Sequence, residues 1–366
     1  MEAKDLNLLQ MPEVVMGHIL DKLDIPDILT LRKTCHHFRN LIDDLHPDPK
    51  IVSTVIKVDP DSIEFKLNFG QSDGLYPDGK LLRIKYGFVE CAPDLCTVQW
   101  FRSDGVREFY FEDGDFIALF CRDFYSIFGG HSFFEFFRKP NNPSIIQDFT
   151  LNLEYFPDDH VHWEAITCRL LSSLESTLQN RPRPLPVKEF NTSVFDKATV
   201  LQILPCFEPK TLEKISITME NGVEEKMRWW CLRGLRELEQ WKSAKVLICP
   251  EIYLAKLREF DDFEEINVKL GKTGVREVLD LKESILNSTS KLKTGRIEIY
   301  TSNGERYFQD TYGFPFTDVD QFGDERKSWF FRFPNEKLFL QISFYPKHLR
   351  FDILERAPEN ARVIRE

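Results

Sequence analysis

The chain has 366 residues and a formal net charge of −11 at pH 7. An acidic chain without a basic run disfavours contacts to a nucleic-acid backbone, and the 42% hydrophobic and 29% charged residues exclude wholesale disorder. The 32 phenylalanines are far above average usage, so the fold needs a large interior.

The sequence has neither the pattern of a transmembrane helix nor that of a secretory signal. No stretch approaches the ~18 consecutive apolar residues of a transmembrane helix. The start, Met-Glu-Ala-Lys-Asp, lacks the basic and apolar parts of a secretory signal, so we expect the chain in the cytosol or the nucleus, without a membrane partner. Eight cysteines are scattered without a CxxC pair, and in a reducing compartment we expect them to be small buried hydrophobes.

A small helical module is predicted over residues 8–46. Apolar residues recur at three- and four-residue steps in two runs, 15–23 and 28–42. Residues 35–37 mark a bend between two short helices, and the segment 43–50, with two prolines, closes the module. A unit of this size buries little apolar surface alone, so we expect it to complete its core against a partner.

The order of residues in this module resembles an F-box. The resemblance is carried by Met11-Pro12-Glu13-Val14, Ile19-Leu20, Asp27-Ile28-Leu29, Leu31-Arg32 and the Cys35-x-x-Phe38-Arg39 step. Met11 stands where many F-boxes carry Leu, a volume-conserving replacement, and Phe38 stands where Trp is common.

The F-box resemblance implies docking to a Skp-type adaptor and, through it, to a cullin scaffold. Pro12, at the start of the first helix, is the expected direct contact, and Leu20 and Leu23 lie one turn apart in one patch. The residues expected to divide between internal packing and the adaptor surface are Met11, Pro12, Val15, Ile19, Leu20, Leu23, Ile28, Leu31, Cys35 and Phe38.

Short alternating strands are predicted after residue 50. They lie at 51–58, 62–69, 81–86, 97–102 and 106–111. Ser103-Asp104-Gly105 favours a hairpin between the last two strands, and an amphipathic helix is predicted over 113–129. We expect these elements to form a capping region over residues 51–140.

From residue 145 to 355 strand and helix patterns alternate. Strands are predicted at 145–155, 187–190, 212–217, 245–249, 264–270 and 296–300, and helices at 163–178, 197–204, 224–241, 252–260 (helix or turn) and 275–286. A proline-rich connector lies at 181–186, and Asn303-Gly304 is predicted to turn the chain back.

Strand centres recur at intervals of about 20–40 residues, as in solenoid repeats. The segments LEKISI (212–217) and FEEINV (263–268) share an apolar frame that is similar to a degenerate leucine-rich repeat. The fold class predicted is α+β: a small helical module, then a large α/β domain over 51–355 with an irregular, curved, parallel sheet, then a charged tail over 356–366. An ordinary α/β layer without repeats is the alternative.

Residues 80–355 also resemble the FTH domain of nematode F-box proteins. Ile203-Leu204-Pro205 followed by 212–217, the segment 238–245 (LEQWKSAK), and the region 339–351 with Phe344 and Arg350-Phe351 carry this resemblance. It implies that the body binds a protein target.

The sequence has no GxxxxGK[ST], GxGxxG, GxSxG or HExxH motif; the stretch 74–80 (GLYPDGK) is followed by Leu81 and not by Ser or Thr. The segment 158–162 (DDHVH) has metal-ligand residue types, but we interpret it as the capped start of a helix. Cys121 and Cys168 fall in apolar helix faces, and nothing in the sequence marks them as nucleophiles. We therefore expect no enzyme activity, no cofactor and no metal.

Together these features predict a substrate-recognition adaptor of an SCF-type ubiquitin ligase, in which the F-box binds the adaptor and the FTH domain binds a protein target. The alternative is a leucine-rich-repeat-like interaction scaffold that never engages a ligase. The target itself has no signature in the sequence, because exposed recognition residues follow no transferable code.

Overall fold

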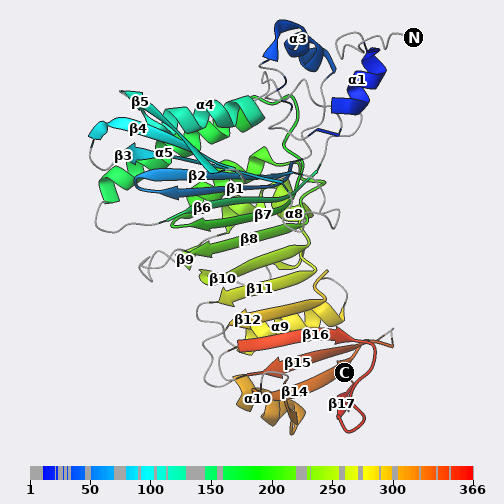
Figure 1. Cartoon of the computed structure of the whole chain (residues 1–366). Helices are drawn as coiled ribbons and strands as arrows, with labels where there is room; N and C mark the ends of the chain where they lie inside the picture. The colour runs from blue at the N-terminus through cyan, green and yellow to red at the C-terminus, as the bar shows by residue number, and fades with distance from the viewer. Residues whose placement is uncertain are drawn as a thin grey trace. The chain divides into compact units, whose positions relative to one another are not determined.

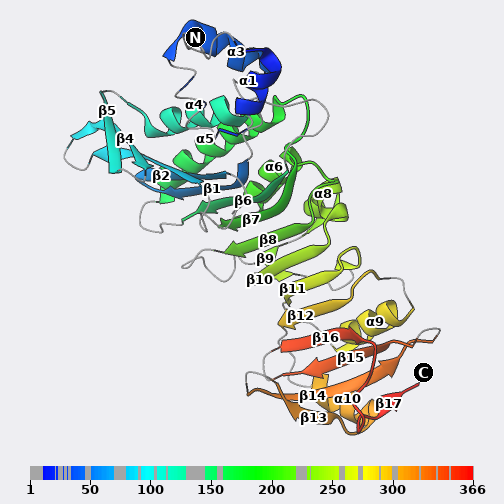
Figure 2. The ribbon, with the colours of Figure 1, turned by 45° about the vertical axis from the view of Figure 1, so that its right-hand side comes forward.

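A computed structural model describes the chain as two compact units (Figures 1 and 2). Unit 1 holds Met1–Asn191 and Gln202–Thr211, and unit 2 holds Thr192–Leu201 and Leu212–Glu366. The residues described are 11–20, 22–23, 28, 31, 34–45, 51–69, 80–89, 92–102, 105–112, 114–128, 145–154, 160–219, 229–230, 232–254, 260–270, 275–287, 290–298, 304–320, 323–334, 337–345 and 348–365.

The N-terminal module of unit 1 is helical, as the sequence predicts. Helices α1 (Glu13–Leu20) and α3 (His36–Leu45) contact each other. Cys35 is non-helical and lies between the helical Thr34 and the start of α3, so the predicted bend is confirmed. Its carbonyl oxygen accepts a hydrogen bond from the Arg39 N–H at 3.1 Å, and its sulfur accepts one from the Phe38 N–H at 3.5 Å.

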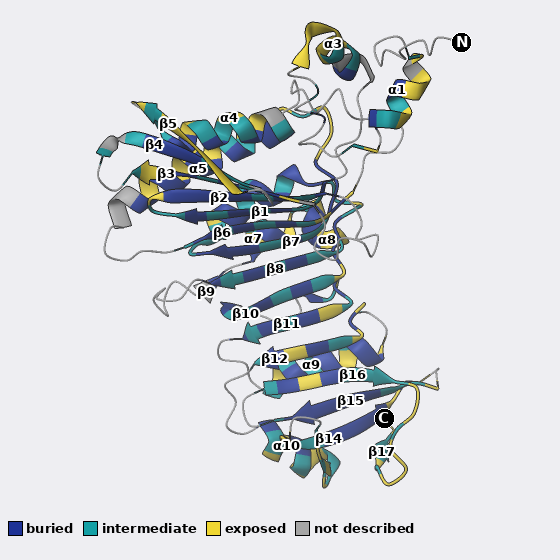
Figure 3. Cartoon of the chain, in the orientation of Figure 1, coloured by how far each residue is buried: buried dark blue, intermediate teal, exposed yellow. Residues whose placement is uncertain are grey.

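The sheet of unit 1 has the order β5–β4–β3–β2–β1–β6. Neighbouring strands are antiparallel except β1 and β6, which are parallel. The strands are β1 (Ile51–Asp59), β2 (Ser62–Phe69), β3 (Lys80–Val89), β4 (Ala92–Arg102), β5 (Gly105–Glu112) and β6 (Ile146–Leu153). Figure 3 shows that β5, at one edge, is exposed along most of its length, whereas β1 and β2 are mainly buried or half-buried.

Helix α4 (Phe116–Phe128) carries four of the 32 phenylalanines. It packs on β2, β3 and β4 and against α5 (His160–Gln179). Four of its phenylalanines recur every fourth residue on one face and are buried: Phe116, Phe120, Phe124 and Phe128.

The rings of this helix continue into a chain of aromatic contacts through unit 1. The Phe120 ring lies 5.5 Å from Phe65 on β2, and the Phe128 ring lies 6.4 Å from Phe149 on β6. Phe149 then contacts Phe207 at 5.1 Å between ring centroids. Edge-to-face and tilted pairs of this kind add stability beyond the buried area.

The end of the proline-rich connector, at Leu185 and Pro186, packs against other parts of unit 1. Leu185 is buried and forms an isolated parallel β-bridge with Phe207. The carbonyl oxygen of Pro186 accepts a hydrogen bond from the Ile146 N–H at 3.0 Å. Beyond it come β7 (Val187–Val194), α6 (Lys197–Ile203) and a 3₁₀ turn, η3 (Leu204–Cys206). The division into units therefore falls after this connector, within β7.

Unit 2 contains a mixed sheet with the order β8–β10–β11–β12–β16–β15–β14–β13. The first four strands are parallel and the last four are antiparallel. The strands are β8 (Lys214–Met219), β10 (Val246–Leu254), β11 (Glu265–Leu270), β12 (Thr294–Glu298), β13 (Phe316–Val319), β14 (Glu325–Arg332), β15 (Phe339–Phe344) and β16 (His348–Leu354).

Two short strands complete the pairing in unit 2. Strand β9 (Trp229–Trp230) runs parallel to the end of β10, and β17 (Val363–Ile364) runs parallel to β14. Helices α7 (Arg233–Arg236), α8 (Glu239–Ser243), α9 (Val275–Leu286) and α10 (Gly304–Tyr312) connect or follow the strands. On α10, the Phe308 ring lies 5.5 Å from Trp329 and 5.0 Å from Phe344, so this helix covers one face of the antiparallel strands.

A glycine joins the parallel and antiparallel halves of this sheet. Gly295 on β12 is directly opposite Phe351 on β16. A Cβ atom on Gly295 would lie 2.4 Å from the Phe351 ring and 2.8 Å from the Ile266 Cγ1 atom. The ring therefore occupies the space that any other side chain at this position would need.

The α+β class predicted from the sequence is confirmed. Strand β2 and helix α9 have the predicted bounds, and the hairpin of β4 and β5 is present. The leucine-rich-repeat character of the sheet stays a prediction.

Several local predictions are wrong. Trp229–Trp230 is in a strand where a helix was predicted. Residues 252–254 are in a strand where a helix or turn was predicted. Both segments pair with a neighbouring strand. Gly304 begins α10 instead of a turn. The strand–helix alternation predicted up to 355 ends at α10, because β13 to β16 pair as antiparallel neighbours. The charged tail 356–366 contains β17.

Some predictions lie outside the described residues. They concern residues 46–50, 103–104, 113, 129, 155, 158–159, 224–228, 255–259, 299–300 and 303, together with Cys91 and Cys231.

Removing one ring from the aromatic chain should destabilise unit 1. We expect Phe120→Ala to lower the free energy of unfolding by about 3–5 kcal/mol, because a buried ring is replaced by a cavity. Tyr125→Ala on the same helix, where the side chain is 40% exposed, should cost below about 1 kcal/mol. Urea unfolding followed by circular dichroism measures both, and equal losses would contradict the packing role of Phe120.

Adding a methyl group at Gly295 should destabilise unit 2. We expect Gly295→Ala to cost about 1–3 kcal/mol through overpacking against Phe351. In a Phe351→Leu background the same change should cost less, because the ring is gone. A double-mutant cycle by thermal unfolding measures this coupling, and additive effects of the two substitutions would refute it.

Candidate interaction surfaces

The helical module has a small interior of its own. Met16 and Leu20 lie four residues apart on α1 and are buried, as are Ile28 and Ile42. Leu20 and Ile28, both predicted for the adaptor-binding group, therefore lie in the interior.

A second group of predicted residues lies at the surface. Pro12, Val15 and Cys35 are exposed. Half-buried positions are Met11, Ile19, Leu23, Leu31 and Phe38. The exposed Pro12 carbonyl accepts hydrogen bonds from the N–H groups of Val15 and Met16 at 2.9 and 3.0 Å, so Pro12 immediately precedes the helix.

Val14 extends this surface. Its side chain is 73% exposed and that of its neighbour Val15 is 40% exposed. Sequence reasoning missed Val14 as a site residue because it falls outside the three- and four-residue apolar spacing. Two adjacent exposed valines on a short helix form an apolar surface next to Pro12, which we call the α1 surface.

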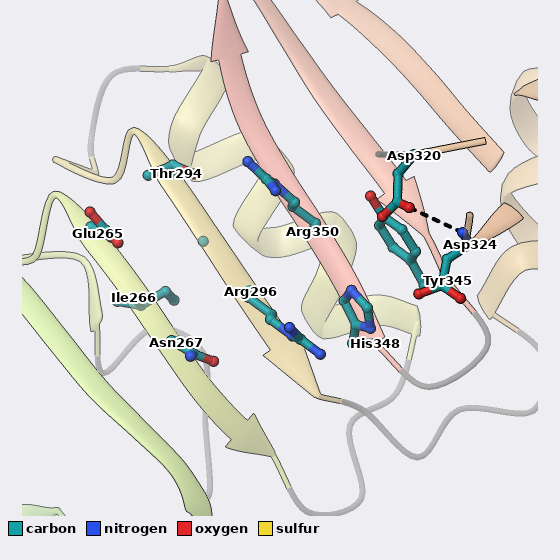
Figure 4. Close-up of a pocket in the computed structure, with 11 residues that line it drawn as sticks. Glu265, Ile266, Asn267, Thr294, Arg296, Asp320, Asp324, Tyr345, His348 and Arg350 are labelled. Carbon is teal, nitrogen blue, oxygen red and sulfur yellow. Dashed lines mark hydrogen bonds between the residues drawn. The ribbon is translucent and has the colours of Figure 1, made fainter. Parts of the chain in front are cut away.

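A second surface lies on unit 2, on the open face of the sheet. A hollow of about 280 Å³ borders strands β11, β12 and β16 (Figure 4). Polar side chains of both signs of charge contribute to its lining: Glu265, Asn267, Thr294, Arg296, Asp320, Asp324, Tyr345, His348 and Arg350. Sequence analysis did not identify this hollow, because the strands that line it are distant in the chain.

Hydrogen bonds and stacking order much of this hollow. Thr294 donates to Asp352 at 2.7 Å, and Arg350 donates to the same carboxylate at 2.7 and 3.1 Å. The His348 and Tyr345 rings stack at 4.2 Å. Burial, followed by repulsion from Arg296, lowers the pKa of His348 below its usual value. The imidazole is therefore neutral at pH 7 and offers one N–H donor.

The cysteines show no sign of an activated nucleophile within the described part of the chain. Cys96, Cys206 and Cys249 are buried, as predicted, and burial raises the pKa of Cys206 to about 12. Cys35 and Cys168 are exposed, contrary to the general prediction, because each falls on the outer side of its module or helix. A raised thiol pKa leaves little thiolate for catalysis.

Neither a metal cluster nor a membrane helix is found among the described residues. No three His, Cys, Asp or Glu side chains in these ranges come together as metal ligands. The segment 158–162 opens α5 at His160, but its side chains are not described. No helix in the described ranges combines the length and apolar character that a membrane crossing requires.

Comparisons with known proteins match both parts of the chain. A family model described as the F-box domain matches residues 8–50, and one described as the FTH domain matches residues 168–310. The protein named F-box A protein 224 of Caenorhabditis elegans is 23% identical over 288 residues, which cover 78% of this chain and 64% of that relative's length. None of the solved structures matches.

The two matched ranges correspond to different parts of the fold. The first contains α1 and α3, and the second begins within α5 and ends within α10, so it includes the parallel strands β8 to β12. The segments 212–217 and 238–245, on which the resemblance rests, lie inside the second range, whereas 339–351 lies beyond it. The chain therefore carries an F-box domain followed by an FTH domain C-terminal to it.

Proposed function

We propose that this chain is a non-enzymatic substrate-recognition subunit of an SCF-type ubiquitin ligase. The F-box binds a Skp-type adaptor, which links the chain to a cullin, and the FTH domain binds a protein target. Such a subunit needs no cofactor or metal of its own, and it acts in the cytosol or nucleus.

The single observation that carries this proposal is the match of an F-box to residues 8–50. The exposure of the α1 surface supports it, since four apolar side chains are buried among the module's described residues while two adjacent valines remain in solvent. Covering Pro12, Val14 and Val15 with an adaptor would remove that apolar surface from water.

Target binding belongs to the second matched range in this proposal. The parallel strands of the FTH domain carry helices on one face and polar side chains on the other, including the hollow beside β12. Exposed side chains on neighbouring strands offer a broad recognition surface. An interaction scaffold without a ligase would use the same surface, so adaptor binding separates the two functions.

A charge on the α1 surface should prevent adaptor binding. We expect Val15→Asp to weaken capture of the full chain by a purified Skp-type adaptor at least about tenfold, because an unpaired carboxylate would be buried in the complex. Val319→Asp is the matched control, since Val319 is 62% exposed on β13 in unit 2. Biolayer interferometry measures the affinity of each variant.

Circular dichroism and thermal melting of the same variants show whether the fold survives. Val15→Asp should melt like the unmodified chain, whereas Leu20→Asp should lose binding together with helical signal, because Leu20 is buried. Undiminished adaptor capture by Val15→Asp would refute the α1 surface as the docking site. No capture by the unmodified chain would favour the scaffold function.

A further inference from the structure

The open face of unit 2 places two arginines directly opposite each other. Arg296 on β12 is the register partner of Arg350 on antiparallel β16, and Asn267 on β11 continues the same row. Their side chains share a face because residues that are opposite in neighbouring strands point to the same side. Like charges in this position repel and cost stability.

Only one of the two charges is compensated among the described residues. Arg350 forms an ion pair with Asp352 at 2.7 Å. The next row of side chains on this face, two residues further along the strands, contains the ion pair of Lys269 and Glu298 at 2.9 Å. Arg296 is exposed and forms no hydrogen bond or ion pair with any side chain in the described ranges. Arg296 is therefore the member of this pair that has no side-chain partner within the described residues, although Glu265, Asp320 and Asp324 line the same hollow.

The groups around Arg296 can complete a binding site. Figure 4 shows its side chain extending along the open face toward His348, with Asn267 on the neighbouring strand. A guanidinium presents paired N–H donors that match the two oxygens of a carboxylate. The Asn267 amide and the His348 ring border the same hollow and carry further N–H donors.

We propose that this hollow binds the carboxylate of an Asp or Glu side chain in an extended segment of the protein target. The proposal rests on the function given above, because it assigns the target-binding surface of the FTH domain and the strands beside it. Arg296 is the central contact. Bound there, the carboxylate supplies the negative charge that the Arg296–Arg350 pair lacks.

The charge balance favours a carboxylate over a phosphate. Glu265, Asp320 and Asp324 line the hollow, and Asp352 borders it through Arg350. A ligand with one negative charge can pair with the Arg296 guanidinium and meets less repulsion from these carboxylates than a ligand with two. A phosphate with nearly two charges would be repelled by the surrounding carboxylates.

Peptide pools test this proposal directly. The probes are fluorescein-labelled peptides with random flanks and one fixed central residue, which is Glu, Asp, Gln, Lys or phosphoserine. We expect the full chain to bind the Glu and Asp pools about tenfold more tightly than the Gln pool, measured by fluorescence anisotropy. Added salt should weaken this preference, because exposed charges are screened.

Substitutions at Arg296 then locate the site. Arg296→Gln should remove the preference for the Glu pool, and Arg296→Lys should retain part of it, because charge stays while the paired donors are lost. Arg306→Gln is the matched control: Arg306 is exposed on α10, and this helix packs on the opposite face of the sheet. That variant should bind like the unmodified chain.

Stability gives an independent readout. Arg296→Gln should melt at the same temperature as the unmodified chain or higher, since it removes repulsion from Arg350. An arginine with only a structural role would instead lower the melting temperature when replaced.

Four outcomes would overturn the proposal: equal binding of the Glu and Gln pools, tighter binding of the phosphoserine pool, unchanged preference in both Arg296 variants, or equal losses in Arg306→Gln. Adaptor capture by Arg296→Gln is measured in parallel and should be unchanged. If the chain still captures the adaptor but shows no preference for the Glu and Asp pools, only this target-binding site is rejected. Loss of adaptor capture in Val15→Asp concerns the F-box alone.

Discussion

The contact between the Phe351 ring and the backbone of Gly295 connects the two kinds of strand in unit 2. Strand β12 is the last of the parallel strands and β16 is the first of the antiparallel ones, so their seam must pack as tightly as any other pair. The Phe351 ring occupies the space beside Ile266 that a side chain at Gly295 would otherwise need. The core of the unit is continuous across this seam because the ring packs directly on the glycine backbone.

The same seam determines the chemistry of the opposite face. Successive side chains on a strand alternate between faces, so a buried Phe351 requires that Arg350 lies on the open side. Gly295 likewise fixes Arg296 on that side. A core requirement thus brings two guanidinium groups together, and Asp352 compensates one of them. The register that places Phe351 opposite Gly295 therefore also places Arg350 opposite Arg296.

Local patterns predicted much of the fold and little of the surface. Strand β2 and helix α9 have strong apolar alternation and helical spacing, so their bounds follow from the sequence. Trp229–Trp230 is in a strand because β10 offers a partner for it, which local spacing does not encode. The Arg296–Arg350 pair depends on the register of strands more than fifty residues apart in the numbering, and Val14 breaks the apolar spacing of its helix. These features require the tertiary structure.

The last strand of the chain protects an edge of the unit 2 sheet. Strand β14 pairs with β13 over residues 325–328, and β17 continues along its next residues, Phe330 and Phe331. Without Val363 and Ile364 the backbone of that stretch would present unpaired donors and acceptors beside two aromatic residues. An edge of this kind is a template on which identical chains associate. Pairing with β17 therefore lowers the tendency of this edge to pair with another chain.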